Sequence, residues 1–326
     1  MNDFEKAMTF NRPEYIPVSM GLYQPTWRRH GEGLEKLVLK HPDVFPGYKE
    51  GDYKATIASP PGIWQYQLGR HFDHWGCEWD NMIEGHDSIC IGHAVKNRED
   101  VYDLKIPEKD IGLEHGLMFL RLTYLRGYEE CMVDFAEEPE ELFVLIDKVL
   151  EYNLRQVHLA LAGMGEALIA GFADDLGMQN MLPTGPVKWR KILKPCFAKL
   201  FAPFVARGKL IGMHSDGCIW EIIPDLYDCG LRYINPQYRA NGLKNLVEVT
   251  RGSGRCRMAV HLDLDRQMFF TATETELRDH VRECVETFAT DTGGLSLYAE
   301  IAEEIPLDNI AVILEELSRA RLFYQK

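Results

Sequence analysis

Apolar residues recur along the chain in two spacings, one typical of buried strands and the other of amphipathic helices. Apolar runs of strand length occupy 16–20, 167–172, 210–214, 231–235, 257–262 and 295–299, and helical spacing is found at 4–8, 113–125, 139–162, 187–206, 219–227, 273–288 and 308–322. From about residue 167 to the end the two patterns alternate, which indicates a parallel sheet with crossover helices.

The number of strand and helix units favours a closed (β/α)8 TIM barrel over an open, doubly wound sheet. No GxGxxG or GxxxxGK[ST] sequence follows any of the strands, which also weighs against a nucleotide-binding open sheet. We therefore expect one α/β barrel domain over residues 1–326. Within it, Thr273 and Glu276 form a capping box, Gly230 ends a helix, and Pro195 or Pro203 breaks one.

Residues 21–110 lack this regularity and are rich in Trp, His, Tyr, Pro and Gly. A long irregular segment inside a domain is commonly functional. We interpret it as an insertion, or lid, that folds over the carboxyl-end face of the barrel, with Trp64 as a substrate contact. The alternative is that its aromatic residues pack a small core of their own.

Polar side chains stand at the ends of five consecutive predicted strands, where ligands bind in α/β folds. In chain order they are Asp174 and Asp175, His214 and Asp216, Asn235 and Gln237, His261 and Asp263, and Glu300. Any one of them could be a helix cap or a hydrogen-bonded scaffold residue. Five strand ends converging on one face of a barrel predict an active site.

Several of these residues are potential ligands for a zinc-like cation: His214, Asp216, Cys218, His261 and Glu300. The His-X-Asp spacing places the side chains of His214 and Asp216 on the same side if the strand continues through the turn. A metal-free alternative is that the aspartates act as general acid or base, or anchor a cationic or hydroxylated substrate.

Charge and cysteine content narrow the class of protein. The formal net charge of −14, without a basic stripe, argues against a nucleic-acid partner or an anionic membrane. No run reaches the roughly 20 apolar residues needed to cross a bilayer. The eight cysteines are scattered, without a CxxC pair, which fits reduced thiols. We expect a soluble, acidic, cytoplasmic protein.

Motifs along most of residues 120–326 resemble the uroporphyrinogen decarboxylase superfamily. They are Asp174-Asp175-Leu-Gly-Met-Gln179, Trp189…Leu193-Lys-Pro195, His214-Ser-Asp-Gly217, Ile223-Pro-Asp225-Leu, Ile234-Asn235-Pro236, Leu264-Asp265-Arg266-Gln267 and Pro306-Leu-Asp-Asn309. The resemblance implies a (β/α)8 barrel with its site at the carboxyl ends of the strands, and it makes a homodimer plausible.

Two branches of the superfamily differ in the residues they require. The decarboxylases carry an amino-terminal Arg-Gln-Ala-Gly-Arg segment, where this chain has Trp27-Arg28-Arg29-His30-Gly31, and a His where this chain has Tyr298-Ala299-Glu300. The other branch resembles zinc-dependent methyltransferases that use a corrinoid protein and have His-X-Cys at the central strand. Here His214 keeps the first ligand and Asp216 replaces the Cys.

The resemblance favours a metal-dependent methyltransferase that moves a methyl group from a small methoxylated or methylated substrate to a corrinoid protein. His214, Asp216 and Glu300 would hold zinc, with Cys218 in reserve. Asp174 or Asp175, with His261, would handle protons, and Asn235, Gln237, Tyr298 and Trp64 would contact substrate. The alternatives are a metal-free decarboxylase that grips carboxylates with Arg28 and Arg29, and a non-catalytic binding protein.

Overall fold

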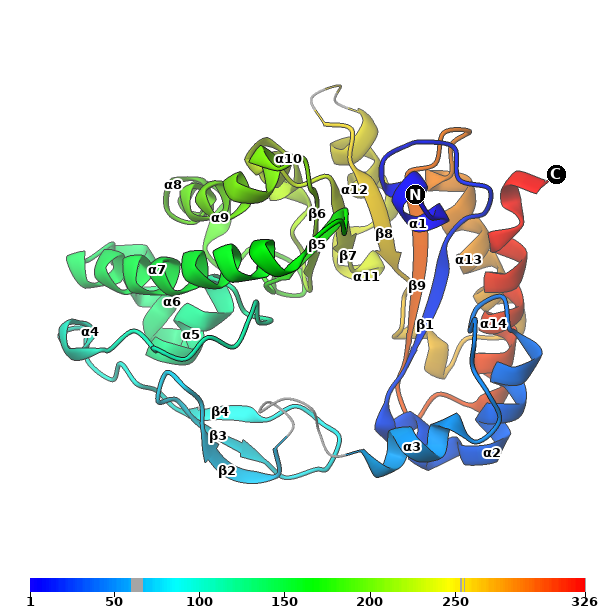
Figure 1. Cartoon of the computed structure of the whole chain (residues 1–326), viewed down its shortest axis with the longest axis horizontal. Coiled ribbons are helices and arrows are strands. Elements are labelled where there is room, and N and C mark those ends of the chain that lie inside the picture. Colours follow the sequence, from blue (N-terminus) through cyan, green and yellow to red (C-terminus); the bar gives the residue numbers. More distant parts are fainter. Residues whose placement is uncertain (60–66, 253, 255, 326) are drawn as a thin grey trace.

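A six-stranded parallel sheet organises the chain (Figure 1). The computed structural model describes residues 1–59, 67–252, 254 and 256–325. The strands lie in the order β1 (Val18–Leu22), β9 (Leu295–Ile301), β8 (Ala259–Asp263), β7 (Tyr233–Pro236), β6 (Leu210–Ser215) and β5 (Ile169–Ala173). Every neighbouring pair in this order is parallel, which confirms the predicted α/β class.

Crossover helices cover the outer face of the sheet. Next to β1, β8 and β9 lie α13 (Glu274–Phe288) and α14 (Leu307–Arg321), whereas α7 (Glu140–Gly163), α8 (Gly185–Ile192), α9 (Lys194–Ala206) and α10 (Ile223–Cys229) lie on the side of β5 and β6 (Figure 1). The short helices α11 (Tyr238–Asn241) and α12 (Leu243–Val247) follow β7.

Predicted helix boundaries are confirmed at three places. The capping box of Thr273 and Glu276 opens α13, and Gly230, in the left-handed region with φ 117°, ends α10. The expected break near Pro195 falls between α8 and α9, at Leu193, whereas Pro203 lies inside α9.

The sheet contains six parallel strands in the described ranges, where the sequence predicted eight. The described part of the chain between β1 and β5 contributes no strand to this parallel sheet. There the chain forms α2 (Gln24–Lys40), α3 (Asp52–Ala58), an antiparallel sheet of β2 (Gly69–Phe72), β3 (Glu78–Asn81) and β4 (Ile89–Gly92), and then α4 (Asp100–Asp103), α5 (Phe119–Arg126) and α6 (Tyr128–Glu137).

The segment 21–110 is therefore more regular than the sequence indicated. Helix α2 alone has 17 residues and buries Trp27, Leu34 and Val38, whose spacing is helical. Gly31, at φ 45°, kinks this helix, so its apolar residues do not form one continuous helical stripe.

The two ends of the parallel sheet differ in what covers them. At the amino end, α1 (Asp3–Met8) buries Ala7 and Met8 in a cluster with Leu210, Tyr233 and Ala259. The carboxyl ends point toward α3 and the antiparallel sheet (Figure 1). The amino end is thus closed by apolar packing, and the polar strand ends face the other way. None of the helices in the described ranges combines the length and apolar character that a membrane-spanning segment requires.

Candidate functional site

Alternation along the strands selects which polar residues face the interior of the curved sheet. On β6, position 212 faces inward, because a Cβ added to Gly212 would lie 1.8 Å from the Tyr233 ring, whose side chain packs in the interior. His214 follows two residues later on the same side. The same alternation of side chains along β7, β8 and β9 places Asn235, His261 and Tyr298 on the inner face of the sheet.

Three of the predicted site residues meet at the carboxyl ends of β5 and β6. We call Asp175, His214 and Asp216 the Asp–His–Asp cluster; one potential ligand atom from each lies within 4.8 Å of the others. Nε2 of His214 lies 3.3 Å from Oδ1 of Asp216 and 3.8 Å from Oδ1 of Asp175. Within the described residues no other group of His, Cys, Asp and Glu meets this geometry.

Asn235 fixes the orientation of the His214 ring. Oδ1 of Asn235 lies 2.7 Å from Nδ1 of His214, and Nδ2 of Asn235 donates to the carbonyl oxygen of His261. Since Oδ1 can only accept, Nδ1 of His214 carries a hydrogen and Nε2 faces the two carboxylates. Burial alone would lower the pKa of His214, but the carboxylates of Asp216 and Asp175 outweigh it and raise this pKa to about 9.

Two basic residues outside the sequence-derived list complete the surroundings of the cluster. Nε2 of His115 lies 3.1 Å from Oδ2 of Asp175, and Nη2 of Arg266 lies 3.2 Å from Oδ2 of Asp216. Burial opposes ionisation of Asp175, but His115 outweighs it and holds the Asp175 pKa below its ordinary value. Arg266 belongs to the Leu264–Gln267 motif that supported the family resemblance, whereas no pattern in the sequence pointed to His115.

One oxygen of the cluster lacks a well-aligned hydrogen bond. Oδ1 of Asp216 is buried, and its ion-pair partner Nε2 of His214 lies 3.3 Å away without forming a hydrogen bond of good geometry. A buried carboxylate oxygen without a donor is costly unless a cation balances it. Histidine nitrogen and carboxylate oxygen are both zinc ligands. The Asp–His–Asp cluster therefore fits a divalent cation by its donor set and by this unsatisfied oxygen.

Asp174 and Asp175 are adjacent but face opposite ways. The carboxylate of Asp174 is fully buried and accepts backbone N–H groups of Met118, Phe119 and Leu120 at the start of α5. Burial raises the pKa of Asp174 to about 6, although these donors oppose the rise. Asp174 thus caps a helix, and only Asp175 reaches the cluster.

Cys218 and Glu300, both predicted ligands, lie outside the Asp–His–Asp cluster. The chain turns at Gly217, with φ 80°, so the alternation of β6 does not continue to Cys218. Glu300 forms an ion pair with Nη1 of Arg266, which also contacts Asp216. Glu300 is therefore linked to the cluster through an arginine and not through a shared ligand position.

The other residues that the sequence placed in the site do not belong to the Asp–His–Asp cluster. Oε1 of Gln237 accepts the N–H of Gly217 at 3.0 Å and so supports the turn after β6. The Tyr298 hydroxyl lies 2.8 Å from that of Tyr23. Nδ1 of His261 lies 2.9 Å from the Ser296 hydroxyl, and burial lowers the His261 pKa to about 4. Trp64 lies outside the described residues.

A large cavity of about 860 Å³ opens over the Asp–His–Asp cluster. Its wall combines strand ends with parts of the segment 21–110, namely residues 23–26, Thr56, Ser59 and 85–87. Six carboxylates and one arginine are among the lining residues: Asp87, Asp175, Asp216, Glu300, Glu303, Glu304 and Arg266. Three histidines, His86, His115 and His214, line it as well, so acidic residues outnumber basic ones but part of their charge is paired. The segment 21–110 contributes the rim of the cavity.

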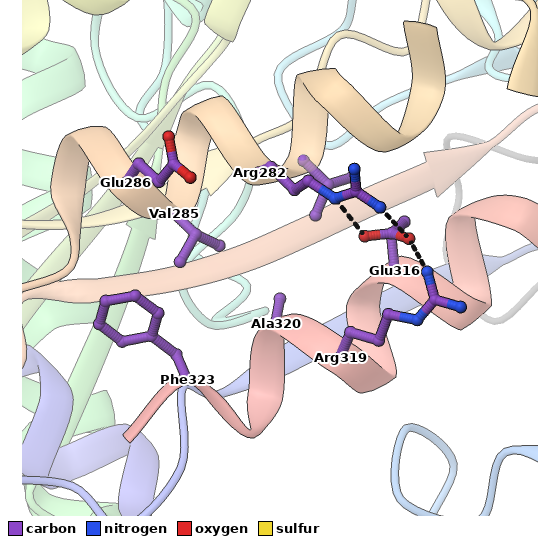
Figure 2. A pocket seen from close by; sticks show the side chains of 8 residues that line it. Arg282, Val285, Glu286, Glu316, Arg319, Ala320 and Phe323 are labelled. Carbon is purple, nitrogen blue, oxygen red and sulfur yellow. Dashed lines mark hydrogen bonds and ion pairs between the residues drawn. The ribbon is translucent and has the colours of Figure 1, made fainter. Parts of the chain in front are cut away.

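A second, smaller cavity of about 200 Å³ lies between α13 and α14 (Figure 2). Arg282 and Arg319 both point at the buried Glu316 (Figure 2). Glu316 also pairs with Arg278. The charges at this place are thus paired with one another, and we interpret the cavity as a gap beside a structural ion-pair network.

The comparison with known families agrees with this arrangement. The sequence profile of the uroporphyrinogen decarboxylase (URO-D) family matches residues 119–320, which is more than half of the chain. The chain belongs to the uroporphyrinogen decarboxylase family. Its matched part contains β5 to β9 and the whole Asp–His–Asp cluster.

A solved structure of a methyltransferase from Methanosarcina mazei is similar to this chain. The TM-score is 0.62 at 16% sequence identity, and the match covers 97% of each chain. At this identity the similarity establishes the shared fold. No curated protein matches the sequence.

Proposed function

We propose that this protein is a metal-dependent methyltransferase that transfers a methyl group from a small methoxylated or methylated substrate to a corrinoid carried by a partner protein. The observation that carries the proposal is the Asp–His–Asp cluster, with the unsatisfied Oδ1 of Asp216, at the floor of an open cavity. The fold shared with a methyltransferase supports the same class of reaction.

Asp175, His214 and Asp216 would hold the metal, which we expect to be zinc. When bound, zinc supplies a Lewis acid that polarises the heteroatom from which the methyl group leaves. Asn235 keeps Nε2 of His214 available as a ligand by holding Nδ1. His115 and Arg266 balance the carboxylates of Asp175 and Asp216 and fix their orientation.

Oxygen and nitrogen ligands favour a substrate whose leaving atom is also hard. Thiolate ligands suit soft metals and soft substrates, and the sulfur of Cys218 is not part of the cluster. A methyl ether is therefore the preferred substrate class. Tyr23 lines the cavity, and its hydroxyl lies 2.8 Å from that of Tyr298. When Tyr298 donates to Tyr23, the Tyr23 hydroxyl keeps a proton that it can donate to an oxygen of the substrate.

The cavity is a poor match for a porphyrinogen, which carries several carboxylates. Six acidic residues line it, and Arg266 is already paired with Glu300 and Asp216. Arg28, which the decarboxylase alternative would need, is paired with Glu84 at 2.7 Å and is exposed. Like charges in a confined site repel, so a polycarboxylate would bind unfavourably.

Metal analysis of the purified protein tests the proposal. We expect about one zinc per chain, lost in His214→Ala and strongly reduced in Asp175→Asn and Asp216→Asn. Cys218→Ser and Glu300→Gln serve as matched controls, because each changes a potential ligand outside the cluster, and both should keep the metal. Absence of metal from the zinc-reconstituted wild type would contradict the proposal.

Activity is the second test. Zinc-loaded protein should demethylate a member of a panel of methyl ethers in the presence of a reduced cobalamin acceptor, and His214→Ala should not. If the protein binds zinc but turns over no methylated compound, the proposed methyltransferase activity is contradicted, whereas the proposed metal site is supported.

A further inference from the structure

Two thiols lie together outside the cavity, on the buried face of the antiparallel sheet. Cys77 directly precedes β3, and Cys90 lies within β4, where its register partner is Trp79. The register between β3 and β4 shifts between Glu78 and Trp79, so a shared contact, and not strand alternation, shows that the two sulfurs lie together. Their Sγ atoms lie 3.3 Å and 3.6 Å from the same carbonyl oxygen, that of Tyr124.

The backbone around Cys77 is held firmly. Its N–H donates to Oδ1 of Asp73, and its carbonyl accepts the N–H of Asp73. Oδ2 of Asp73 is fixed in turn by Nη1 of the buried Arg121 at 2.6 Å. The position of the Cys77 sulfur next to Cys90 is therefore set by the tight connection between β2 and β3, and not by a loose loop.

The two thiols differ in access and in acidity. Cys90 is partly exposed, whereas the other seven cysteines are buried. The hydrogen bond from Cys77 lowers the pKa of Cys90, and Nδ1 of His93 lies 3.8 Å from its sulfur. The same hydrogen bond and burial raise the pKa of Cys77. A more acidic, accessible thiol beside a buried one is the arrangement of an attacking and a resolving cysteine.

We propose that Cys77 and Cys90 form a thiol–disulfide exchange site that reacts with small-molecule disulfides. The Cys90 thiolate attacks one sulfur of the disulfide RSSR, forming a Cys90–S–S–R bond, and RS⁻ leaves and takes up a proton. The Cys77 sulfur then attacks the Cys90 sulfur, and its proton goes to the second departing RS⁻. The net reaction oxidises two thiols to one disulfide and reduces RSSR to two RSH.

The disulfide would close a loop that contains the β3–β4 hairpin. The connection between these strands includes Gly85, His86 and Asp87, which line the rim of the large cavity. Oxidation would thus restrain part of that rim. This inference is independent of the proposed function, because it rests on the antiparallel sheet and not on the Asp–His–Asp cluster.

Peptide mapping of the folded, full-length protein tests the proposal. The reduced protein is incubated with oxidised glutathione, its remaining thiols are blocked, and it is digested and analysed by mass spectrometry. We expect a linked Cys77–Cys90 peptide that dithiothreitol removes, and slower hydrogen exchange over residues 82–88 in the oxidised form. Absence of that linked peptide, with glutathione adducts on other cysteines, would overturn the proposal.

Single variants separate the roles of the two sulfurs. Cys77→Ser should stop at the mixed disulfide, with glutathione on Cys90, whereas Cys90→Ser should give neither an adduct nor a link at Cys77. Cys284→Ser is the matched control, because it removes a buried thiol elsewhere and should leave the reaction unchanged. A glutathione adduct on Cys77 in the Cys90→Ser variant would contradict the proposal that Cys90 attacks first. If a variant fails to fold, the peptide map of the wild-type protein still shows whether Cys77 and Cys90 form a disulfide.

Discussion

Nδ1 of His214 lies 2.7 Å from Oδ1 of Asn235, and through this contact the neighbouring strand β7 determines which nitrogen of the imidazole faces the carboxylates. The same amide donates to the carbonyl oxygen of His261 on β8. Asn235 therefore connects three adjacent strands and keeps the His214 ring in one orientation, as outer hydrogen-bond partners of metal ligands do.

Asn235→Ala should weaken zinc binding without removing a ligand. Loss of an outer hydrogen-bond partner lowers metal affinity by about 10–100-fold, and we expect a decrease of that size in a competition titration with a chelator. Asn245→Ala is the matched control, because its amide donates to the carbonyl oxygen of Asn241, which lies outside the Asp–His–Asp cluster. Equal zinc affinity in wild type and Asn235→Ala would show that the contact does not orient the ligand.

Asp174→Ala should lower stability and leave the metal content unchanged. The substitution leaves three backbone N–H groups at the start of α5 without an acceptor, at a cost of about 1–3 kcal/mol in the free energy of unfolding. Denaturant titration measures this change. Asp175→Asn should show the reverse pattern, and loss of zinc from Asp174→Ala with unchanged stability would contradict the assignment of the two aspartates.

Gly212→Ala should destabilise the interior of the curved parallel sheet. An added Cβ would lie 1.8 Å from the Tyr233 ring, which is buried against α1 and cannot move freely. We expect a loss of about 1–3 kcal/mol, as for overpacked cores. Gly171→Ala is the matched control on the paired strand β5, because Gly171 faces Gly212 in the register and has nothing within 4 Å of an added Cβ. Equal stability of the two variants would exclude the close approach.

His280 should contribute to acid sensitivity. Its Nε2 accepts the N–H of Asp265 at 3.0 Å, and burial lowers its pKa from 6.5 to about 4. The unfolded chain therefore binds a proton at higher pH than the folded chain does. The contribution of neutral His280 is complete above pH 6.5 and is lost as the pH falls toward 4, with a slope of at most about 1.4 kcal/mol per pH unit.

The measurement is the free energy of unfolding of wild type and His280→Gln between pH 4 and 8. Gln can accept the same N–H but does not titrate, so its curve should be flatter between pH 4 and 6.5. Parallel curves for the two proteins would show that His280 does not titrate differently on folding.

Local sequence patterns were sufficient to predict the α/β class and the position of most elements after residue 139. Long runs such as α7 and α13 carry a clear helical spacing, and the strands β5 to β9 are apolar because both faces of a parallel sheet are covered. The sequence also placed His214 and Asp216 in the site, because alternation on one strand is a local property. The capping box and Gly230 were predictable for the same reason.

The residues from distant parts of the chain that complete the site could not be predicted in this way, because they meet only in the folded protein. His115 precedes α5 and Arg266 follows β8, and each reaches the cluster because the sheet curves and brings their elements together. The choice between Asp174 and Asp175 depended on where α5 begins, and the exclusion of Cys218 depended on the turn at Gly217. All of these features depend on how segments far apart in the sequence pack against one another. The local spacing of residues carries no information on that packing.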